Sequence, residues 1–418
     1  MTKNFNKKNL TICIEDIDEI VDEEQINRQK ILNEIELLKN SCYSYSNYIQ
    51  NQTILRNNLL SKNNMYLNQL LFYMDGENYL SDLSYYKIIK NDDIQNISKS
   101  IFIKNYCDIN NNFLLNEQKI KSEFNLLKLI TETPNHKNLQ IDILKTLKRY
   151  NNRYSDILPY NYNSVKYQTN VTNNYDKSNQ NDWYINASFI NGPFKSDKNI
   201  FIAAQTPVLN TIGKFYKMCF NNNIKILIML CCFEEEGRKK CEYYLPNQIN
   251  EEISFDNNSV KVKITNEEFL IKNCLIKREI SITIENQTKN IYHLQMLNWP
   301  DYSKPEGEIG FNTVNYLINI MAQSREIFPD SPILIHCSAG TGRTGTLIAI
   351  FNLIKCISFF QTVNNDNSIS PFFSVFNMVR RLREQRSGMV ACFEQYKFIY
   401  HFLFNWIQRN ILHSDSNK

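Results

Sequence analysis

The feature that most constrains the fold is a short apolar run, followed at once by a glycine-rich polar loop and a second apolar run. Residues 332–335 read PILI, residues 336–345 read HCSAGTGRTG, and residues 346–354 read TLIAIFNLI. A short continuous apolar run is typical of a strand that is buried on both faces, and the longer run suits a buried helix. The pattern predicts a strand at 332–335, a loop at 337–342 and a helix from about Arg343.

The residues in this loop suggest a chemistry. A loop that enters a helix N-terminus can bind an anion, because backbone N–H groups and the helix dipole point at it. Gly340 and Gly342 let the backbone turn its N–H groups inward. The same field favours the thiolate form of Cys337, which is a nucleophile at neutral pH. Arg343 can fork onto two phosphate oxygens and stabilise their charge in the transition state. A cysteine and a guanidinium around one anion site therefore predict phosphoryl transfer.

Further strands are predicted before this loop, from runs rich in β-branched and aromatic residues. These runs are 199–206, 224–230, 259–266, 278–286 and 291–297. Several of them follow one another without a helix between, which indicates antiparallel hairpins within a mixed sheet. Helical patterns occur at 121–130 and 141–150. Together these patterns predict an α/β fold.

The first 110 residues differ in amino-acid composition from the rest of the chain and are rich in Asn, Lys, Ile and Tyr. Apolar residues at helical spacing predict a helix at about 14–39, with acidic residues in its first turns. Glu24 and Arg28 interrupt its heptad seam, which favours a helix that packs on its own protein over a dimerising coiled coil. The sequence does not identify the role of this region.

Composition narrows the function classes. The chain has 47 Lys and Arg against 43 Asp and Glu, a net charge of only +4, without the basic excess typical of nucleic-acid binders. It has no apolar stretch of the roughly 18 residues that a membrane span needs, and its N-terminus turns acidic before a secretory apolar core forms. The 11 cysteines show no disulfide framework or zinc spacing. We expect a cytoplasmic protein, with a nuclear location left open, and no indication of oligomeric state.

The loop resembles the signature of the cysteine-dependent protein tyrosine phosphatases: His-Cys, five residues, Arg, Ser or Thr, Gly. Thr341 stands where that family usually has Ile or Val. A second family motif, Trp-Pro-Asp, occurs at 299–301. Further similar stretches in the family's order are NRYSDILPYN (152–161), DWYINASFING (182–192), FIAAQTPVLNT (201–211), EEEGRKKCEYYLP (234–246) and REQRSGMVACFEQYKF (383–398).

The resemblance covers about residues 118–412 and implies three parts of the chain. Residues 1–117 form an N-terminal extension that is mostly helical or irregular, residues 118–412 a catalytic domain, and residues 413–418 a short polar tail. The implied fold is a highly twisted mixed β-sheet flanked by helices. Its phosphate-binding loop lies between a buried strand and a helix N-terminus.

The resemblance also implies roles for individual residues. Cys337 is the nucleophile, Asp301 the general acid, and Arg343 binds the phosphate; Thr344 supports the thiolate, and Gln395 orients water in the second step. The implied substrate-binding residues are Tyr154, Asp156, Ser338, Ala339, Gly340, Thr341 and Gly342. The supporting residues are His336, Glu235, Lys240 and Trp299. The implied partners are tyrosine-phosphorylated proteins, and no metal or other cofactor is implied.

The sequence departs from the family pattern at a few positions. Ala391 stands where the family usually has a water-positioning glutamine, Thr206 where glycine is usual, and Ser164 where arginine is usual. The loss at 391 bears on hydrolysis of the phosphocysteine, because alanine has no hydrogen-bonding side chain.

Two alternatives to a tyrosine phosphatase of the non-receptor type therefore stay open. One is a phosphotyrosine-binding pseudophosphatase or slow, substrate-trapping scaffold. The other is a phosphatase for phosphoinositides or for phosphoserine and phosphothreonine. The second is disfavoured because the loop contains no lysine and Tyr154 implies a deep pocket.

Overall fold

The computed structural model of the protein describes residues 117–131, 149–166, 184–194, 196–364, 375–407 and 409–410. The chain divides into two compact units. A sheet unit comprises Lys137–Leu347 and Gln385–Gln395, and a helical unit comprises Met1–His136, Ile348–Glu384 and Tyr396–Lys418. The helix predicted at about 14–39 and the tail at 413–418 lie outside the described residues.

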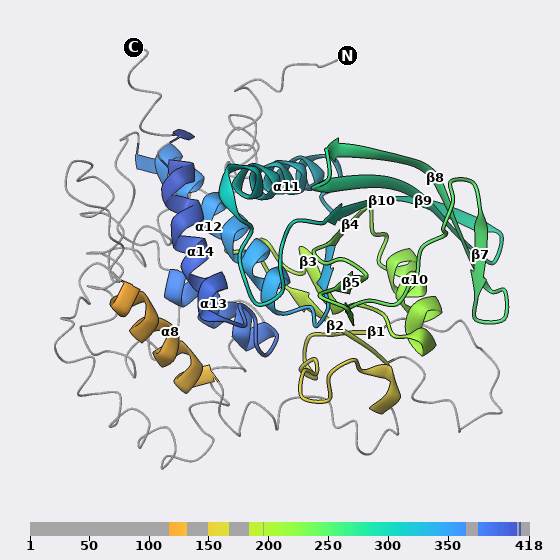
Figure 1. Ribbon diagram of the computed structural model, residues 1–418, viewed down its shortest axis with the longest axis horizontal. Coiled ribbons are helices and arrows are strands. Elements are labelled where there is room, and N and C mark those ends of the chain that lie inside the picture. The colour runs from red at the N-terminus through yellow and green to blue at the C-terminus, as the bar shows by residue number, and fades with distance from the viewer. Residues whose placement is uncertain are drawn as a thin grey trace. The chain divides into compact units, whose positions relative to one another are not determined.

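The sheet unit is built on a mixed sheet with nine strands among the described residues, in the order β1-β2-β3-β11-β4-β10-β9-β8-β7 (Figure 1). The strands are β1 (Ser164–Lys166), β2 (Tyr184–Ile190), β3 (Phe201–Gln205), β4 (Ile226–Met229), β7 (Glu252–Phe255), β8 (Val260–Ile271), β9 (Leu275–Ile284), β10 (Gln287–Met296) and β11 (Ile333–Cys337). A separate two-stranded hairpin contains β5 (Glu234–Glu235) and β6 (Arg238–Lys239).

The centre of the sheet is parallel and its flanks are antiparallel. Strand β11 pairs in parallel with β3 and β4, and β4 pairs in parallel with β10. Strands β7 to β10 form successive antiparallel pairs. All residues of β3, β4 and β11 are buried, whereas β8 alternates buried with more exposed residues from Val260 to Ile264. Continuous apolar runs thus form the centre, and alternating patterns form the hairpins.

Among the described residues, helices α10 (Ile212–Asn221) and α11 (Gly307–Ile327) lie entirely within the sheet unit. Helix α10 contacts β8 and β9 and contributes Phe215 and Tyr216 to the buried core. The Tyr216 hydroxyl donates to the carbonyl of Tyr244 at 2.7 Å. Helix α11 follows the Trp-Pro-Asp segment (299–301) and precedes β11. Short 3-10 turns occupy η3 (Arg149–Asn151) and η5 (Leu209–Thr211).

The helical unit contains α8 (Glu117–Thr131) and most of α12 (Gly342–Asn364), α13 (Val375–Gln385) and α14 (Phe393–Ile407). Helix α13 packs on α8: Arg383 donates to Thr131 Oγ1 at 3.0 Å, and its guanidinium lies over the Phe124 ring. Helix α14 also packs on α8, where the rings of Phe124 and Tyr396 lie 5.4 Å apart.

The predicted α/β fold with a mixed sheet is confirmed. Each run predicted as a strand overlaps β3, β4, β8, β9, β10 or β11, and the helix expected from about Arg343 begins at Gly342. The pattern at 121–130 lies within α8, whereas residues 141–148 lie outside the described residues. Within the described part of the chain, no helix is both long and apolar enough to cross a membrane.

Candidate active site

The predicted phosphate-binding loop, here called the phosphate-shaped loop (337–342), lies where the sequence places it. It connects the end of β11 at Cys337 to the start of α12 at Gly342. Gly340 has φ +69°, and a Cβ at this position would lie 2.0 Å from the carbonyl oxygen of Ala204 on β3. Only glycine fits such a left-handed backbone so close to another strand. Cys337 is buried at the end of its strand. The tight turn of the loop is therefore built into the sheet.

A buried arginine that the sequence analysis did not assign supports the loop from behind. Arg386 is fully buried, and burial lowers its pKa to about 10. Its guanidinium donates to the carbonyl oxygens of Gly340 at 2.9 Å and Ala339 at 3.1 Å, and to Asn186 Oδ1 at 2.7 Å. Arg386 thus ties the loop to strand β2. The only signal in the sequence is that it falls within the similar stretch at 383–398.

The guanidinium of Arg343 is fixed on several sides. Its Nη1 donates to Glu235 Oε1 at 2.6 Å and to the carbonyl of Leu230 at 2.8 Å, and its Nη2 donates to Glu235 Oε2 at 2.6 Å. Burial alone would lower the pKa of Arg343, but Glu235 and the charge at Cys337 raise it overall. Arg343 is therefore a permanent, pre-oriented cation beside the cysteine.

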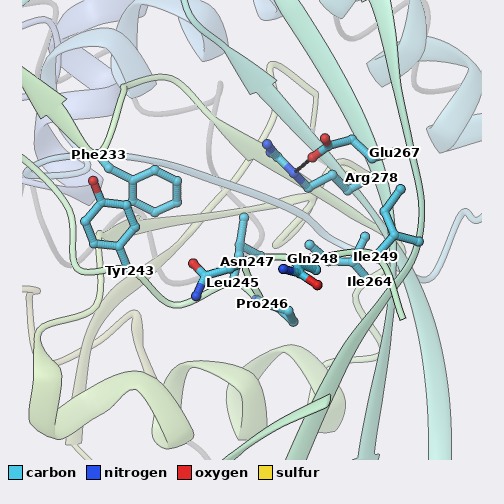
Figure 2. Close-up of a pocket in the computed structure, with 10 residues that line it drawn as sticks. All are labelled: Phe233, Tyr243, Leu245, Pro246, Asn247, Gln248, Ile249, Ile264, Glu267 and Arg278. Carbon is cyan, nitrogen blue, oxygen red and sulfur yellow. Dashed lines mark hydrogen bonds and ion pairs between the residues drawn. The ribbon is translucent and has the colours of Figure 1, made fainter. Parts of the chain in front are cut away.

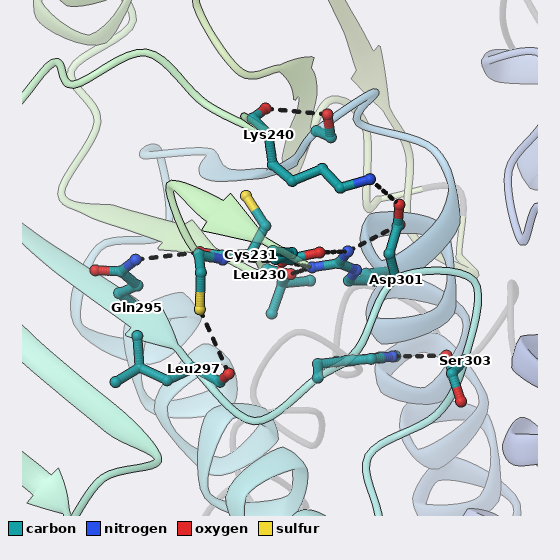
Figure 3. Close-up of polar contacts among 12 residues, drawn as sticks. Leu230, Cys231, Lys240, Gln295, Leu297, Asp301 and Ser303 are labelled. Carbon is teal, nitrogen blue, oxygen red and sulfur yellow. Dashed lines mark hydrogen bonds and ion pairs between the residues drawn. The ribbon is translucent and has the colours of Figure 1, made fainter. Parts of the chain in front are cut away.

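The aspartate of the Trp-Pro-Asp segment reaches the same guanidinium. Asp301 Oδ1 accepts from Arg343 Nη2 at 2.8 Å, and its Oδ2 accepts from Lys240 Nζ (Figure 3). Burial opposes ionisation of Asp301, but the hydrogen bonds from Lys240 and Arg343 outweigh it, so its pKa lies below the usual value. Trp299 is buried and donates from Nε1 to the carbonyl of Ser303 at 3.0 Å. The acid segment is thus held over the loop.

Tyr154, in the segment 152–161 that is expected to recognise the substrate (the recognition segment), contacts the phosphate-shaped loop. Tyr154 Oη lies 2.9 Å from Ser338 Oγ, which in turn donates to the carbonyl of Lys240 at 3.0 Å. Gln205 anchors this segment by accepting from the backbone N–H of Arg153 at 2.9 Å. Asp156 is exposed. Hydrogen bonds at Ser338, the residue after Cys337, therefore link Tyr154 and the segment that follows the β5–β6 hairpin to the loop.

Ala391 and Gln395 lie close to Gly342, at the end of the loop. A Cβ on Gly342 would lie 3.4 Å from Ala391 Cβ and 2.9 Å from Gln395 Oε1, so both residues border the loop. Gln395 Oε1 accepts from the backbone N–H of Ala391 at 3.0 Å. The hydroxyl of Thr344 is buried and has no hydrogen-bond partner among the described residues. Ala391 therefore removes one amide from this side of the loop and leaves the other.

The remaining predicted residues support the loop through its backbone. The carbonyl of Thr341 accepts from the N–H groups of Gly345 at 2.8 Å and Val390 at 3.2 Å. His336 is fully buried, and burial lowers its pKa to about 4, so it is neutral at pH 7. All the predicted site residues lie in the sheet unit. The geometry combines a buried thiol, a fixed cation and a carboxylate, which suits nucleophilic attack on a phosphate ester.

The protein-tyrosine phosphatase family profile matches residues 148–405. The chain belongs to this family. It is 33% identical over 252 residues to human tyrosine-protein phosphatase non-receptor type 12, an alignment that covers 60% of this chain and 29% of the relative. It is 34% identical over 224 residues to tyrosine-protein phosphatase 2 of Dictyostelium discoideum, covering 52% of this chain and 53% of that protein. The chain thus matches only 29% and 53% of the length of these two phosphatases.

Solved phosphatase structures share the fold. The crystal structure of the catalytic domain of human protein tyrosine phosphatase non-receptor type 18 has a TM-score of 0.58 and 25% identity, and the match covers 70% of this chain and 98% of that domain. The complex of PTPN18 with HER2 phospho-peptides has a TM-score of 0.57 and 26% identity, covering 68% and 98%. The expected highly twisted sheet with flanking helices is thereby confirmed. The domain limits at 118 and 412 stay a prediction.

Proposed function

We propose that this protein hydrolyses phosphotyrosine in other proteins through a phosphocysteine intermediate. The observation that carries the proposal is the position of Arg343. It is clamped by Glu235, lies beside Cys337 and is shared with Asp301. Arg343 could serve as the phosphate anchor, Cys337 as the nucleophile and Asp301 as the general acid of one displacement.

In the first step the thiolate sulfur of Cys337 attacks phosphorus and the bond from phosphorus to the tyrosyl oxygen breaks. Arg343 holds two non-bridging oxygens and stabilises the charge that spreads over them. Glu235 keeps the guanidinium in orientation through both carboxylate oxygens. When the sulfur becomes the leaving group in the second step, the buried hydroxyl of Thr344 is available to donate to it, because this hydroxyl has no other partner among the described residues.

Asp301 would protonate the leaving phenolate. Its lowered pKa without substrate reflects its contacts with Lys240 and Arg343, against the effect of burial. A phosphate dianion that takes over the guanidinium would replace an attractive charge by a repulsive one. The pKa of Asp301 would then rise, and the protonated form needed for the first step would become populated.

In the second step water attacks the phosphocysteine and releases inorganic phosphate and the Cys337 thiolate. Asp301, now ionised, would accept the proton of this water. Gln395 is the amide side chain beside the loop that could orient the water, since position 391 carries only a methyl group.

Phosphotyrosine as the substrate is supported by the pocket and by the relatives. The hydroxyl of Tyr154 is held against Ser338 of the loop, so its ring can form a wall whose height favours a long aromatic ester. PTPN18, a relative in structure, has been solved with HER2 phospho-peptides. We assign tyrosine-phosphorylated proteins as partners of this chain, and we place it in the cytoplasm because human relatives carry the name non-receptor.

A phosphotyrosine-binding protein with slow turnover is the second candidate, and Ala391 is the observation that favours it. It ranks lower because Cys337, Arg343 and Asp301 are all retained, and a pure binding module has no need of an acid.

The test is to measure phosphate release by the purified full chain from phosphotyrosine, phosphoserine and phosphoinositide substrates. We expect turnover of phosphotyrosine alone, and its loss in Cys337→Ser, because a serine hydroxyl is not ionised in such a loop. Cys356→Ser, on helix α12, is the matched control and should keep full activity. Tight phosphotyrosine-peptide binding without turnover would favour the binding protein, and preference for phosphoserine would reject the tyrosine assignment.

A further inference from the structure

A row of buried polar side chains runs through the sheet unit to the catalytic loop. Nη1 of Arg278, on β9, lies 3.5 Å from Nδ1 of His293 on β10. Nε2 of His293 lies 2.9 Å from the hydroxyl of Tyr244, and the same hydroxyl lies 2.9 Å from Nε2 of His336. Nδ1 of His336 lies 3.3 Å from the carbonyl oxygen of Cys337. The two histidines and the tyrosine are fully buried, and Arg278 is 9% exposed.

The outer end of the row borders a cavity of about 280 Å³, lined among others by Tyr243, Ile249 and Ile264. There Nε of Arg278 donates to Glu267 Oε2 at 2.5 Å (Figure 2), while its Nη1 donates to Gln295 Oε1 at 2.8 Å. An arginine has five N–H donors and no acceptor, and it stays charged in proteins. Arg278 is therefore a fixed donor toward His293.

The fixed donor determines where each proton of the row lies. Nδ1 of His293 faces an arginine, which can only donate, so this nitrogen carries no proton. The ring proton is therefore on Nε2, which donates to the oxygen of Tyr244. The hydroxyl proton of Tyr244 is then free to be donated to Nε2 of His336. That nitrogen must also be bare, which puts the ring proton of His336 on Nδ1.

The contact at the inner end of the row is compatible with the same arrangement. Nδ1 of His336 faces the carbonyl oxygen of Cys337, which can only accept. The alternative acceptor for the Tyr244 hydroxyl is the thioether of Met229 at 3.5 Å, and sulfur is a much weaker acceptor than an imidazole nitrogen at 2.9 Å. Burial lowers the pKa of both histidines, and Arg278 lowers that of His293 further, so each ring carries one proton at pH 7.

We propose that Arg278 is a positioning residue for the catalytic cysteine: through His293 and Tyr244 it fixes the ring proton of His336 on Nδ1, facing Cys337. Every N–H and O–H dipole of the row then points its positive end toward the cysteine. Aligned hydrogen bonds in a buried row polarise one another. The row therefore favours the thiolate, in addition to the loop and helix that carry Cys337. This inference rests on the proposed role of Cys337 as the nucleophile.

The direct test is to observe the ring nitrogens by NMR. The chain has only 5 histidines, so a two-bond ¹H–¹⁵N spectrum of protein labelled at histidine can be assigned with single His→Gln variants. We expect the proton of His293 on Nε2 and that of His336 on Nδ1, with neither ring titrating between about pH 5.5 and 8. A His336 ring protonated on Nε2 in the unaltered protein would overturn the proposal, whatever any variant does.

Variants of Arg278 test the cause. In Arg278→Met we expect mixed tautomers at both histidines. We also expect iodoacetamide to alkylate Cys337 about three- to tenfold more slowly at pH 6, because a rise of one unit in the thiol pKa lowers the thiolate fraction about tenfold. Arg278→Lys should restore both readouts, because lysine is also a charged donor without an acceptor. Glu267→Gln is the matched control: it removes the outer partner, keeps the arginine and should leave the tautomers unchanged.

The double variant Tyr244→Phe, Arg278→Met, compared with the two single variants, completes a double-mutant cycle. Because phenylalanine interrupts the row, Arg278→Met should add no further slowing of alkylation in this background. Equal slowing with and without Tyr244, or a lysine variant that behaves like the methionine one, would show a merely structural effect and reject the proposal. Tautomers and alkylation require no turnover, so their outcome stands apart from any failure to detect phosphatase activity.

Discussion

At position 391 the side chain that borders the phosphate-shaped loop is a methyl group. Its neighbour Gln395 lies at the same loop, but its Oε1 already accepts from the backbone N–H of Ala391. Its Nε2 remains to hold a water. A single, partly engaged amide should orient an attacking water less well than two. Under the proposed phosphocysteine mechanism, we therefore expect hydrolysis of the intermediate to be the slower step.

We therefore predict that Ala391→Gln raises kcat severalfold and leaves kcat/KM nearly unchanged, because that ratio reports only the steps up to release of the phenol. The unaltered protein should show a burst of phenol close to the enzyme concentration when rapidly mixed with an aryl phosphate. Stopped-flow absorbance measures both. Three results together would reject slow hydrolysis: no burst, little effect of Ala391→Gln, and loss of turnover in Gln395→Ala. Gln395 would then hold the water alone.

The residues of the site differ in how far the sequence predicts them. Cys337 and Arg343 lie in one short loop whose glycines and strand-to-helix context predict an anion site, and the resemblance to the phosphatase family then points to Asp301. Arg386 and Tyr244 act through contacts with carbonyls and rings from distant parts of the chain. A buried arginine has no local pattern that separates it from a solvated one, so only the folded structure reveals its partners.

At the scale of elements, the predicted strands are those whose sequence is apolar or alternating. The hairpin of β5 and β6 is missed because it lies within the charged run EEEGRKK and its strands are not buried. Its register follows from the two-residue turn of Glu236 and Gly237, both with positive φ, and the hairpin places Glu235 against Arg343. Helix α11 is also unassigned from sequence, although Phe311, Val314 and Leu317 form a buried face at helical spacing.

The packing of α8 on α14 contains a buried acid that gives a prediction for this element. Glu123 on α8 accepts from the hydroxyl of Tyr400 at 2.5 Å, while its Oε1 has no hydrogen-bond partner among the described residues. Burial raises its pKa to about 7, although the tyrosine hydrogen bonds oppose the shift. In the unfolded chain it titrates near its usual value of about 4.3. The native state therefore binds its proton more tightly, and stability is lost as pH rises from about 4.3 through 7.

We predict that Glu123→Gln raises the free energy of unfolding by about 1–2 kcal/mol at pH 8. It should change it little at pH 4, where Glu123 of the parent is protonated in the native state and mostly protonated in the unfolded chain. Urea denaturation at the two pH values measures this. Glu117→Gln, at the exposed start of the same helix, is the control. It removes an exposed ion pair with Lys397 and should therefore lower, not raise, the free energy of unfolding at pH 8, and only slightly. A stabilisation of equal size at pH 4 and pH 8 would contradict the linkage.

At the scale of the whole molecule, the two units share continuous helices. Helix α12 begins at Gly342 in the sheet unit and runs to Asn364 in the helical unit, and α13 and α14 also have residues in both. Unfolding one unit alone would require these helices to melt part-way, which leaves backbone groups without intrahelical partners. Shared helices therefore favour one cooperative transition over two separate ones.

We predict that urea unfolds both units in a single transition, which two tryptophans can report separately. Trp299 lies in the sheet unit and Trp406 in the helical unit, and both are buried. Variants that retain only one of them, with Phe at the other tryptophan positions, should show coincident fluorescence transitions with the same midpoint. Glu123→Gln, although it lies in the helical unit, should then raise the midpoint at pH 8 equally in both variants. A shift confined to Trp406 would mean that the helical unit unfolds independently and that the shared helices do not couple the two units.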